Sequence, residues 1–304
     1  APRMAGQIAA RTGCQLLAET KNARSERGLG RVNIPQIPYP FDGAIAALKD
    51  IRLLILVDAS KPVAFFAYPG KPRFLTHPDC RVETLAMAGE DMDEALRMLG
   101  AAVGAQTDNV AYLSQARAAW SAADDTLDAI SLAGIVASLL PENAIVVDEA
   151  ITTGRQLQRS CAGAPPHDWL EIPGGSIGYG LPCATGAAVA CPDRKVLAII
   201  GDGSAMYTLQ ALWTMAREGL DVTVVICANR KYQILRGELQ AMGGPEPGAN
   251  ARRMLTLDSP DLDWVHMARG HGVDAVRAAT AGEFASALRT SLAQRGPRLI
   301  EAVL

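Results

Sequence analysis

The run Gly201-Asp202-Gly203-Ser204 and the later Asn229 carry side chains that can hold a divalent metal beside a diphosphate. Carboxylate and amide oxygens are ligands that Mg²⁺ accepts, together with water and phosphate oxygens. Gly203 would let the backbone approach a phosphate closely, and Ser204 would offer its hydroxyl and amide at the start of a helix. Because the positive end of a helix favours anions, the pattern predicts a magnesium and diphosphate site.

Three elements must position these residues. Residues 195–200 form a short apolar run that predicts a buried parallel strand, and residues 222–227 form a second, β-branched run. Between them, the spacing of apolar residues predicts a helix over 207–218. A strand, helix and strand form a right-handed crossover, so the carboxyl ends of the two strands lie close together. Asn229 is therefore expected to reach the ion that Asp202 holds.

Residues 201–232 resemble the cofactor motif of thiamine diphosphate enzymes in the benzoylformate decarboxylase and acetolactate synthase superfamily. Residues 141–152, 173–182 and 296–301 follow that family's order as well, so the resemblance covers roughly the last 180 residues, the size of one domain. It implies that Asp202 and Asn229 are side-chain ligands of Mg²⁺ and that Lys231 contributes a backbone carbonyl. It also implies cofactor contacts at Gly201, Gly203 and Ser204.

Two further segments match cofactor-binding positions of that family. Ile177 matches a bulky aliphatic residue that bends the cofactor, and Gly175 matches a backbone carbonyl that accepts from its aminopyrimidine, with Ser176 between them. Ile151 and Thr152 match a turn that touches the diphosphate. An ordinary loop, or simple core packing of Ile177, would also explain the first segment. We expect no strand directly before this glycine-rich stretch, and its spacing is not that of a dinucleotide fingerprint.

The resemblance implies a thiamine diphosphate- and Mg²⁺-dependent enzyme that acts on 2-oxo acids, by decarboxylation, carboligation or both. Family members take a catalytic glutamate from the N-terminal pyrimidine domain of a neighbouring subunit, and no segment here matches that domain. We therefore assign no catalytic residue in this chain, expect it to be inactive alone, and expect the complete protein to be at least a dimer. A natural split enzyme is the alternative to an N-terminally incomplete chain.

The expected fold is α/β, with two doubly wound parallel-sheet domains. Residues 1–106 would form an N-terminally incomplete middle domain, 107–125 a linker with one helix, and 126–304 the diphosphate- and magnesium-binding domain. In the first part we predict a strand over 15–18, further strands over 53–57 and 81–85, and helices over 42–48 and 92–103. The segment 58–63 lacks the arginine-rich pattern of flavin-binding relatives, so FAD is not expected.

Composition agrees with a cytoplasmic protein. The 304 residues have a net charge of −3 and no basic run, so nucleic acid is not an expected partner. No apolar run reaches transmembrane length. The six cysteines form no Cys-x-x-Cys pair and are expected to be reduced thiols in the core, and the four histidines lack metal-ligand spacing.

Two other functions remain open. A binding module would hold the metal and the diphosphate cofactor without turnover. A nucleotide-dependent oxidoreductase with nicotinamide or flavin would share the doubly wound pattern, but the missing dinucleotide fingerprint disfavours it.

Overall fold

The computed structural model describes residues 1–105, 119, 120 and 124–304, and the chain folds as two compact units. The first unit comprises Ala1–Asn22 and Gly30–Ser114, and the second comprises Ala23–Leu29 and Gln115–Leu304. The short stretch from Ala23 to Leu29 thus belongs to the second unit, although it interrupts the first in sequence. The division at 1–106, 107–125 and 126–304 stays a prediction, and most of the predicted linker helix lies outside the described residues.

The first unit contains three helices and a two-stranded parallel sheet among its described residues. Strands β2 and β3 pair in parallel from Leu53 beside Arg81, and α3 begins after Asp91, whose side chain accepts from the amide of Glu94. These elements confirm the strands and helices predicted for this part, apart from the strand at 15–18. The bounds are α1 (Pro2–Thr12), α2 (Phe41–Leu48), β2 (Leu53–Val57), β3 (Arg81–Ala86) and α3 (Met92–Ala102).

The strand predicted over residues 15–18 is wrong. Only Ala18 forms a bridge, in parallel with Gln36, through hydrogen bonds that involve Pro35 and Ile37. The partner segment contains Pro35 and Pro38, and proline has no N–H to extend a ladder. The apolar run therefore remains a single bridge.

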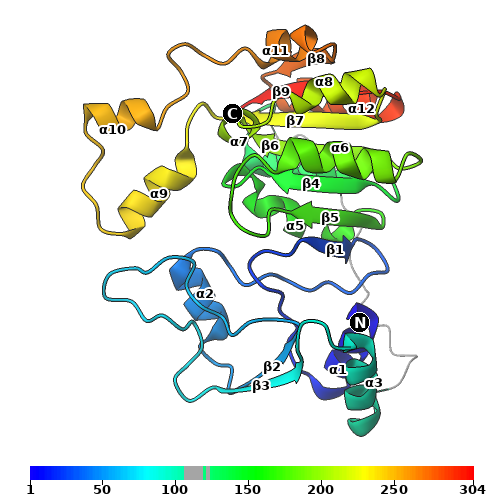
Figure 1. Cartoon of the computed structure of the whole chain (residues 1–304), viewed down its shortest axis with the longest axis vertical. Coiled ribbons are helices and arrows are strands. Elements are labelled where there is room, and N and C mark those ends of the chain that lie inside the picture. Colours follow the sequence, from blue (N-terminus) through cyan, green and yellow to red (C-terminus); the bar gives the residue numbers. More distant parts are fainter. Residues whose placement is uncertain (106–118, 121–123) are drawn as a thin grey trace. The chain divides into compact units, whose positions relative to one another are not determined.

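The second unit is built on a seven-stranded sheet with the order β1-β5-β4-β6-β7-β9-β8 (Figure 1). All neighbours are parallel except β1 and β5, which confirms the α/β fold. The strands are β1 (Arg24–Arg27), β4 (Ile145–Glu149), β5 (His167–Glu171), β6 (Val196–Gly201), β7 (Val222–Ala228), β8 (Asp274–Ala278) and β9 (Arg298–Val303). The helices are α4 (Ala129–Leu139), η2 (Thr153–Gln156), α5 (Leu157–Ser160), η3 (Cys161–Gly163), α6 (Gly180–Ala190), α7 (Asp202–Ala205), α8 (Ala211–Arg217), α9 (Gln233–Ala241), α10 (Ala249–Met254), α11 (Trp264–Gly270) and α12 (Ala281–Ala293).

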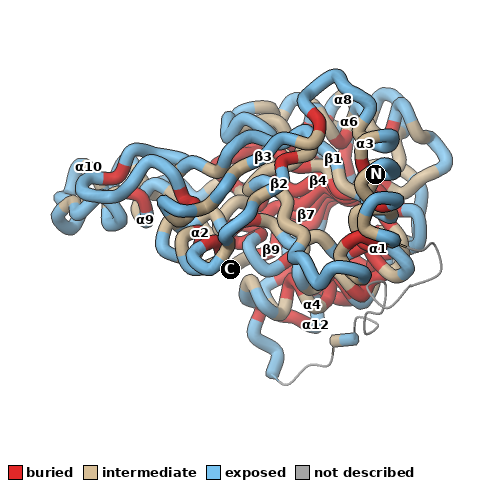
Figure 2. Tube along the Cα trace, turned by 90° about the horizontal axis from the view of Figure 1, so that it is seen from below, coloured by how far each residue is buried: buried red, intermediate tan, exposed pale blue. Residues whose placement is uncertain are grey.

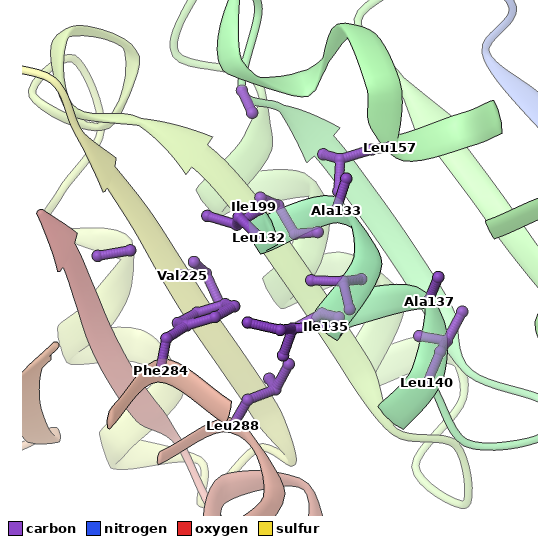
Figure 3. Packing of buried hydrophobic residues seen from close by; sticks show 14 of the residues in the cluster. Leu132, Ala133, Ile135, Ala137, Leu140, Leu157, Ile199, Val225, Phe284 and Leu288 are labelled. Atoms are coloured by element: carbon purple, nitrogen blue, oxygen red, sulfur yellow. The ribbon is translucent and has the colours of Figure 1, made fainter. Parts of the chain in front are cut away.

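The central strands are covered on both faces, as their continuous apolar runs predicted. Every residue of β4 and β7 is buried (Figure 2). On one face, Phe284 and Leu288 of α12 pack beside Val225 of β7 and Ile135 of α4 (Figure 3). On the other face, a second core joins α6, α8 and α11 to the same strands. The sheet is therefore held rigidly between two helical layers, which fixes where its strands end.

The strand order reverses direction at β4. The chain passes from β4 outward to β5, then returns across the sheet to β6 on the other side of β4. In open α/β sheets, ligands bind outside the carboxyl ends of the strands at such a switch point. We call the edge at which β4, β6 and β7 end the carboxyl edge.

Strand β5 leads into the glycine-rich stretch, so the expectation that no strand precedes it is wrong. The sequence His167-Asp168-Trp169-Leu170-Glu171 contains three polar residues and lacks the apolar run that is typical of a buried parallel strand. It is nevertheless mostly buried, because Asp168 forms ion pairs with Arg24 of β1 and with Arg194. Paired charges can be buried where single charges cannot.

The helix predicted over 207–218 begins later than expected. A one-turn helix, α7, starts at Asp202, residues 207–210 form turns, and α8 begins only at Ala211. Ser204 therefore lies inside a single helical turn and not at the start of a long helix. A single turn has a smaller dipole than a full helix, so the attraction of this segment for an anion depends mainly on its individual amides.

No helix in the described part of the chain combines the length and apolar character needed to cross a bilayer. All six cysteines are free, and Cys161 and Cys227 are fully buried, but Cys14 is exposed, so the expectation of a core thiol is wrong for Cys14. Burial raises the pKa of the Cys161 thiol to about 12.

The buried His167 makes the stability of the second unit depend on pH. Its Nδ1 lies 2.7 Å from the carbonyl oxygen of Pro165 and therefore carries the proton, while burial lowers its pKa below the ordinary 6.5. The unfolded chain thus takes up a proton before the folded one, so stability is lost as pH falls from about 6.5 through the lowered pKa. We expect the free energy of unfolding to fall by at most about 1.4 kcal/mol per pH unit there. Urea unfolding between pH 7.5 and 5 measures it.

The variant His167→Gln should flatten this pH dependence, whereas His266→Gln, at an exposed position, should not. An unchanged slope in His167→Gln would contradict the assignment.

Candidate functional site

Asp202 lies at the junction of β6 and α7 and connects the ends of two neighbouring strands. The residue is 3% exposed. Oδ1 accepts from the amide of Gly203 at 2.8 Å, and Oδ2 accepts from the amide of Arg230 at 2.6 Å. Burial raises the pKa of Asp202, and these hydrogen bonds oppose that shift. The carboxylate therefore holds the loop after β7 against the end of β6.

The loop after β7 is tightly formed around Asn229. The side-chain oxygen Oδ1 of Asn229 accepts from the amide of Lys231 at 3.1 Å, and Arg230 between them has a left-handed backbone with φ 56°. A non-glycine residue in that region costs about 1–2 kcal/mol, so the surrounding contacts must hold it there. The structure thus brings Asp202, Asn229 and Lys231 to one place on the carboxyl edge, as predicted.

A hydrogen-bonded clamp closes the base of this loop. The amide of Tyr232 donates to the carbonyl of Leu255 at 3.0 Å, and the amide of Leu257 donates to the carbonyl of Arg230 at 2.8 Å. The segment between these pairs carries α9 and α10 and projects from the sheet (Figure 1). We call residues 233–254 the arm. None of the residues of α10 is buried.

The turn after β4 contains a second strained residue. Ile151 has φ 49°, which is exceptional for a β-branched side chain. The turn is closed by hydrogen bonds from the amides of Thr153 and Gly154 to the carbonyl of Ala150, at 3.1 and 3.4 Å. Ile151 and the following Thr152 therefore lie at the switch point, where the predicted diphosphate turn was placed. Backbone strain of this kind is frequent at ligand sites.

The glycine-rich loop between β5 and α6 carries Gly175, Ser176 and Ile177. Gly175 has φ 72°, a conformation that favours glycine. Ile177 is half-buried and lies outside the buried core, so core packing does not account for it. The end of the loop is held by Glu149, whose carboxylate accepts from the amides of Gly178 and Gly180. The loop is thereby attached to the end of β4.

Gly203 admits an aromatic ring. A Cβ at this position would lie 2.8 Å from Cδ1 of Tyr232 and still closer to Cε1. The absence of a side chain at Gly203 therefore leaves space for the Tyr232 ring, whereas the sequence predicts that a phosphate approaches the backbone there. Burial raises the pKa of Tyr232, and the nearby Tyr207 and Asp202 add to this shift.

The variant Gly203→Ala should force the Tyr232 ring away and lower the free energy of unfolding by about 1–3 kcal/mol, the usual cost of overpacking. In the Tyr232→Ala background the same change should cost much less, so a double-mutant cycle by urea unfolding measures the contact. The control Gly186→Ala on α6 has open space around the added methyl and should stabilise by about 0.5–1 kcal/mol. Additive effects at residues 203 and 232 would show that the ring does not occupy this space.

The carboxyl edge fits a divalent cation with few protein ligands. In the described residues, Asp202 forms no ion pair with a basic side chain and no cluster of three His, Cys, Asp or Glu groups is placed to hold a metal. A buried carboxylate with raised pKa is stabilised by a cation that neutralises it. Mg²⁺ is bound in this manner, by one or two carboxylates with phosphate oxygens and water completing the shell.

Two residues of this edge were not singled out from the sequence as site residues, Glu149 and Tyr232. Glu149 is 1% exposed although it is charged, and Tyr232 covers Gly203. A carboxylate that directly ends an apolar strand is a usable signal, because it must find partners at the edge of the sheet. The approach of Tyr232 to Gly203 has no such signal, since it depends on a turn in the intervening loop.

Comparison with known proteins identifies the second unit. Residues 153–302 match the family described as thiamine pyrophosphate enzyme, C-terminal TPP binding domain. Over 301 residues the chain is 47% identical to IlvX of Mycobacterium tuberculosis, whose name assigns it provisionally to the acetolactate synthase large subunits; the match covers 99% of this chain and 58% of that protein. A benzoylformate decarboxylase of Pseudomonas aeruginosa is 38% identical over 168 residues, which cover 55% of this chain and 30% of the decarboxylase.

Among solved structures, a thiamine diphosphate-dependent 4-hydroxybenzoylformate decarboxylase of Rhodococcus jostii RHA1 matches with a TM-score of 0.77 and 26% identity. The match covers 99% of this chain and 58% of the decarboxylase chain. The chain thus spans little more than half the length of IlvX and of this decarboxylase. Residues 153–302 therefore belong to the thiamine pyrophosphate enzyme family as its C-terminal TPP-binding domain, and the chain is related to an acetolactate synthase large subunit-like protein and to benzoylformate decarboxylases.

Proposed function

We propose that this chain binds thiamine diphosphate with Mg²⁺ at the carboxyl edge and serves an enzyme that acts on 2-oxo acids, by decarboxylation or carboligation. The observation that carries the proposal is the buried Asp202, which joins the end of β6 to the loop after β7 and, among the described residues, forms no ion pair, because the guanidinium of Arg230 pairs with Asp261. The names of the relatives, two of them decarboxylases of 2-oxo acids, support the substrate class.

The metal ligands in this proposal are Asp202, Asn229 and the backbone carbonyl of Lys231. Each oxygen of Asp202 accepts one amide hydrogen bond and keeps a second lone pair, so the carboxylate can bind a cation without losing those bonds. The Asn229 oxygen likewise accepts only one hydrogen bond, from Lys231. The loop is therefore formed before the ion arrives, which lowers the cost of ordering it on binding.

The cofactor contacts fall on three segments of the edge. The turn after β4 and the motif after β6 would hold the diphosphate, and the glycine-rich loop would hold the rings. The residues are Ile151, Thr152, Gly175, Ser176, Ile177, Gly201, Asp202, Gly203, Ser204, Asn229 and Lys231. The ring of Tyr232 would have to turn away from Gly203 if the diphosphate approaches that amide.

When bound, thiamine diphosphate supplies a carbon nucleophile for the carbonyl of a 2-oxo acid and an electron sink for the carbon dioxide that leaves. The residues of this chain bind and orient it. Asp202 and Asn229 would hold the ion that neutralises the diphosphate, and Ile177 would pack against the rings. We assign the catalytic carboxylate to no residue of this chain and expect cofactor binding without turnover. We expect the whole enzyme to assemble at least as a dimer.

A nucleotide-dependent oxidoreductase is the less favoured function. In a dinucleotide fold, the pyrophosphate lies against amides at the start of the first helix. Here the amides of Gly178, Tyr179 and Gly180 at the start of α6 already donate to the carboxylate of Glu149. That end of α6 therefore offers no free amides at these three positions for a nucleotide phosphate.

Calorimetric titration of thiamine diphosphate into the chain, with and without Mg²⁺, tests the proposal. We expect binding at least about tenfold tighter with Mg²⁺, which corresponds to about 1.4 kcal/mol. Titration with NAD⁺ should produce no heat of binding. Metal-independent binding would contradict the assigned ligands, and binding of NAD⁺ alone would favour the oxidoreductase. Turnover of a 2-oxo acid by the chain alone would contradict the expectation that the catalytic carboxylate comes from outside this chain.

A further inference from the structure

Glu149 is a buried carboxylate at the carboxyl edge to which the proposed function gives no role. It is the last residue of β4, and 1% of its surface is exposed. Its Oε1 accepts from the amides of Gly178 at 2.7 Å and Tyr179 at 3.1 Å, and its Oε2 accepts from the amide of Gly180 at 2.8 Å. One side chain thus satisfies three consecutive backbone donors.

These three donors belong to the start of α6, where amides have no partner within the helix. A negative charge at the start of an eleven-residue helix is also favoured by the helix dipole. The contact requires glycine at 180, because a Cβ there would lie 2.8 Å from Oε2 of Glu149 and would collide with the Ile200 side chain. The loop and the carboxylate are therefore fitted to each other.

Glu149 also lies next to the two other segments that form the proposed cofactor site. Its main chain continues directly into the strained turn at Ile151, and its carbonyl oxygen lies 3.7 Å from the position of a Cβ on Gly201. From the other side, Oγ1 of Thr208 donates to the carbonyl of Gly178 at 2.9 Å. The glycine-rich loop is thus fastened between the end of β4 and the segment after Asp202.

We propose that Glu149 is a positioning residue, which sets the place of the Gly175–Ile177 loop relative to the turns at Ile151 and Asp202. The inference rests on the proposed function, because it concerns the same cofactor. The carboxylate acts through its hydrogen bonds to the loop and does not itself touch the cofactor. Both of its oxygens are directed to amides, which also spares a bound diphosphate from facing an unpaired negative charge.

The test uses Glu149→Gln with Glu301→Gln as the matched control. Glutamine keeps the shape but has only one acceptor oxygen, so it cannot hold three amides in this arrangement. Glu301 lies on β9 of the same sheet, is also 1% exposed, and has its own partner in Arg277 at 3.0 Å. Both variants lose a buried charged hydrogen bond, but only the first loosens the loop.

Two measurements are made on each variant, hydrogen exchange of the amides at 178–180 in the cofactor-free chain and the affinity for thiamine diphosphate with Mg²⁺. In Glu149→Gln we expect exchange at these amides to accelerate at least about tenfold and affinity to fall at least about tenfold, because hydrogen bonds to charged groups are the strong ones. Glu301→Gln should change neither. If the wild-type chain fails to bind, the proposed function fails and this inference with it.

If the wild type binds and Glu149→Gln binds equally well, the positioning role is wrong while the proposed function stands. Equal losses in both variants would also overturn it, since they would show a general loss of stability. Should Glu149→Gln not fold, Thr208→Val loosens the same loop from its other side. Unchanged exchange at Gly178 and unchanged affinity in Thr208→Val would then overturn the inference.

Discussion

The variant Asp202→Ala is expected to lower the Mg²⁺-dependent affinity for thiamine diphosphate at least about 100-fold. Changes outside the first ligand shell of a metal typically cost 10–100-fold in affinity, and removal of the sole carboxylate ligand should cost no less. Alanine also frees the amide of Arg230, so the loop that carries Asn229 loses its attachment to β6. Calorimetry at fixed Mg²⁺ measures the effect.

Asp221→Ala is the matched control. Asp221 is a partly buried aspartate that pairs with Lys195, and it precedes β7 at the opposite end of that strand. Its removal should change stability and leave cofactor affinity within about twofold, since distant sites act independently. Equal affinity of Asp202→Ala and the wild type would place the metal elsewhere.

Urea unfolding distinguishes the structural role of Asp202 in the metal-free chain from its proposed role as a metal ligand. Burial raises the pKa of Asp202, so the metal-free folded chain carries the cost of a desolvated charge. Asp202→Asn removes that charge but leaves one acceptor oxygen for the amides of Gly203 and Arg230, so we expect the metal-free variant to unfold at a higher urea concentration than Asp202→Ala, which keeps no acceptor. Mg²⁺ together with cofactor should then stabilise the wild type alone.

Phe284→Ala is expected to lower the free energy of unfolding by about 3–5 kcal/mol, the usual cost of removing a fully buried aromatic ring. Phe284 lies on α12 with no exposed surface, in the core that covers one face of the sheet (Figure 3). Its removal leaves a cavity against β7, whose carboxyl end carries Asn229. Urea unfolding followed by circular dichroism measures the loss.

Ile130→Ala provides the comparison for Phe284. Ile130 is 72% exposed on α4, so its truncation should change the free energy of unfolding by no more than about 0.5 kcal/mol. A loss below about 1 kcal/mol in Phe284→Ala would show that this core collapses around the missing ring.

The parts of the fold that could be predicted from sequence are those in which the side chains alone decide the structure. β6 and β7 are continuous apolar runs, and only a buried parallel strand suits them. β5 could not be predicted in this way, because its burial depends on Arg24 from β1, which lies 144 residues away in sequence from its partner Asp168. The family motif predicts which residues lie at the carboxyl edge, and the ends of the strands place those residues there.

The details of the site depended on contacts that no local pattern encodes. The spacing of apolar residues predicts a helix over 207–218, yet the chain turns over 207–210 and thereby lets Thr208 reach Gly178. The motif explains Gly203 only by the approach of a phosphate, although in the structure Tyr232 occupies the adjacent space. Both differences come from packing between segments that are well separated in sequence.

Because the clamp closes the base of the arm, residues 233–254 can vary without changing the metal-binding loop at the carboxyl edge. The arm leaves and returns through the same pair of hydrogen-bonded segments, Arg230–Tyr232 and Leu255–Leu257. Closing a loop at a fixed base makes its length inexpensive to change, because closure entropy grows only slowly with the number of residues. The arm is therefore a segment that can be replaced. Segments of other lengths could be grafted there to alter what approaches the carboxyl edge while the metal-binding loop keeps its shape.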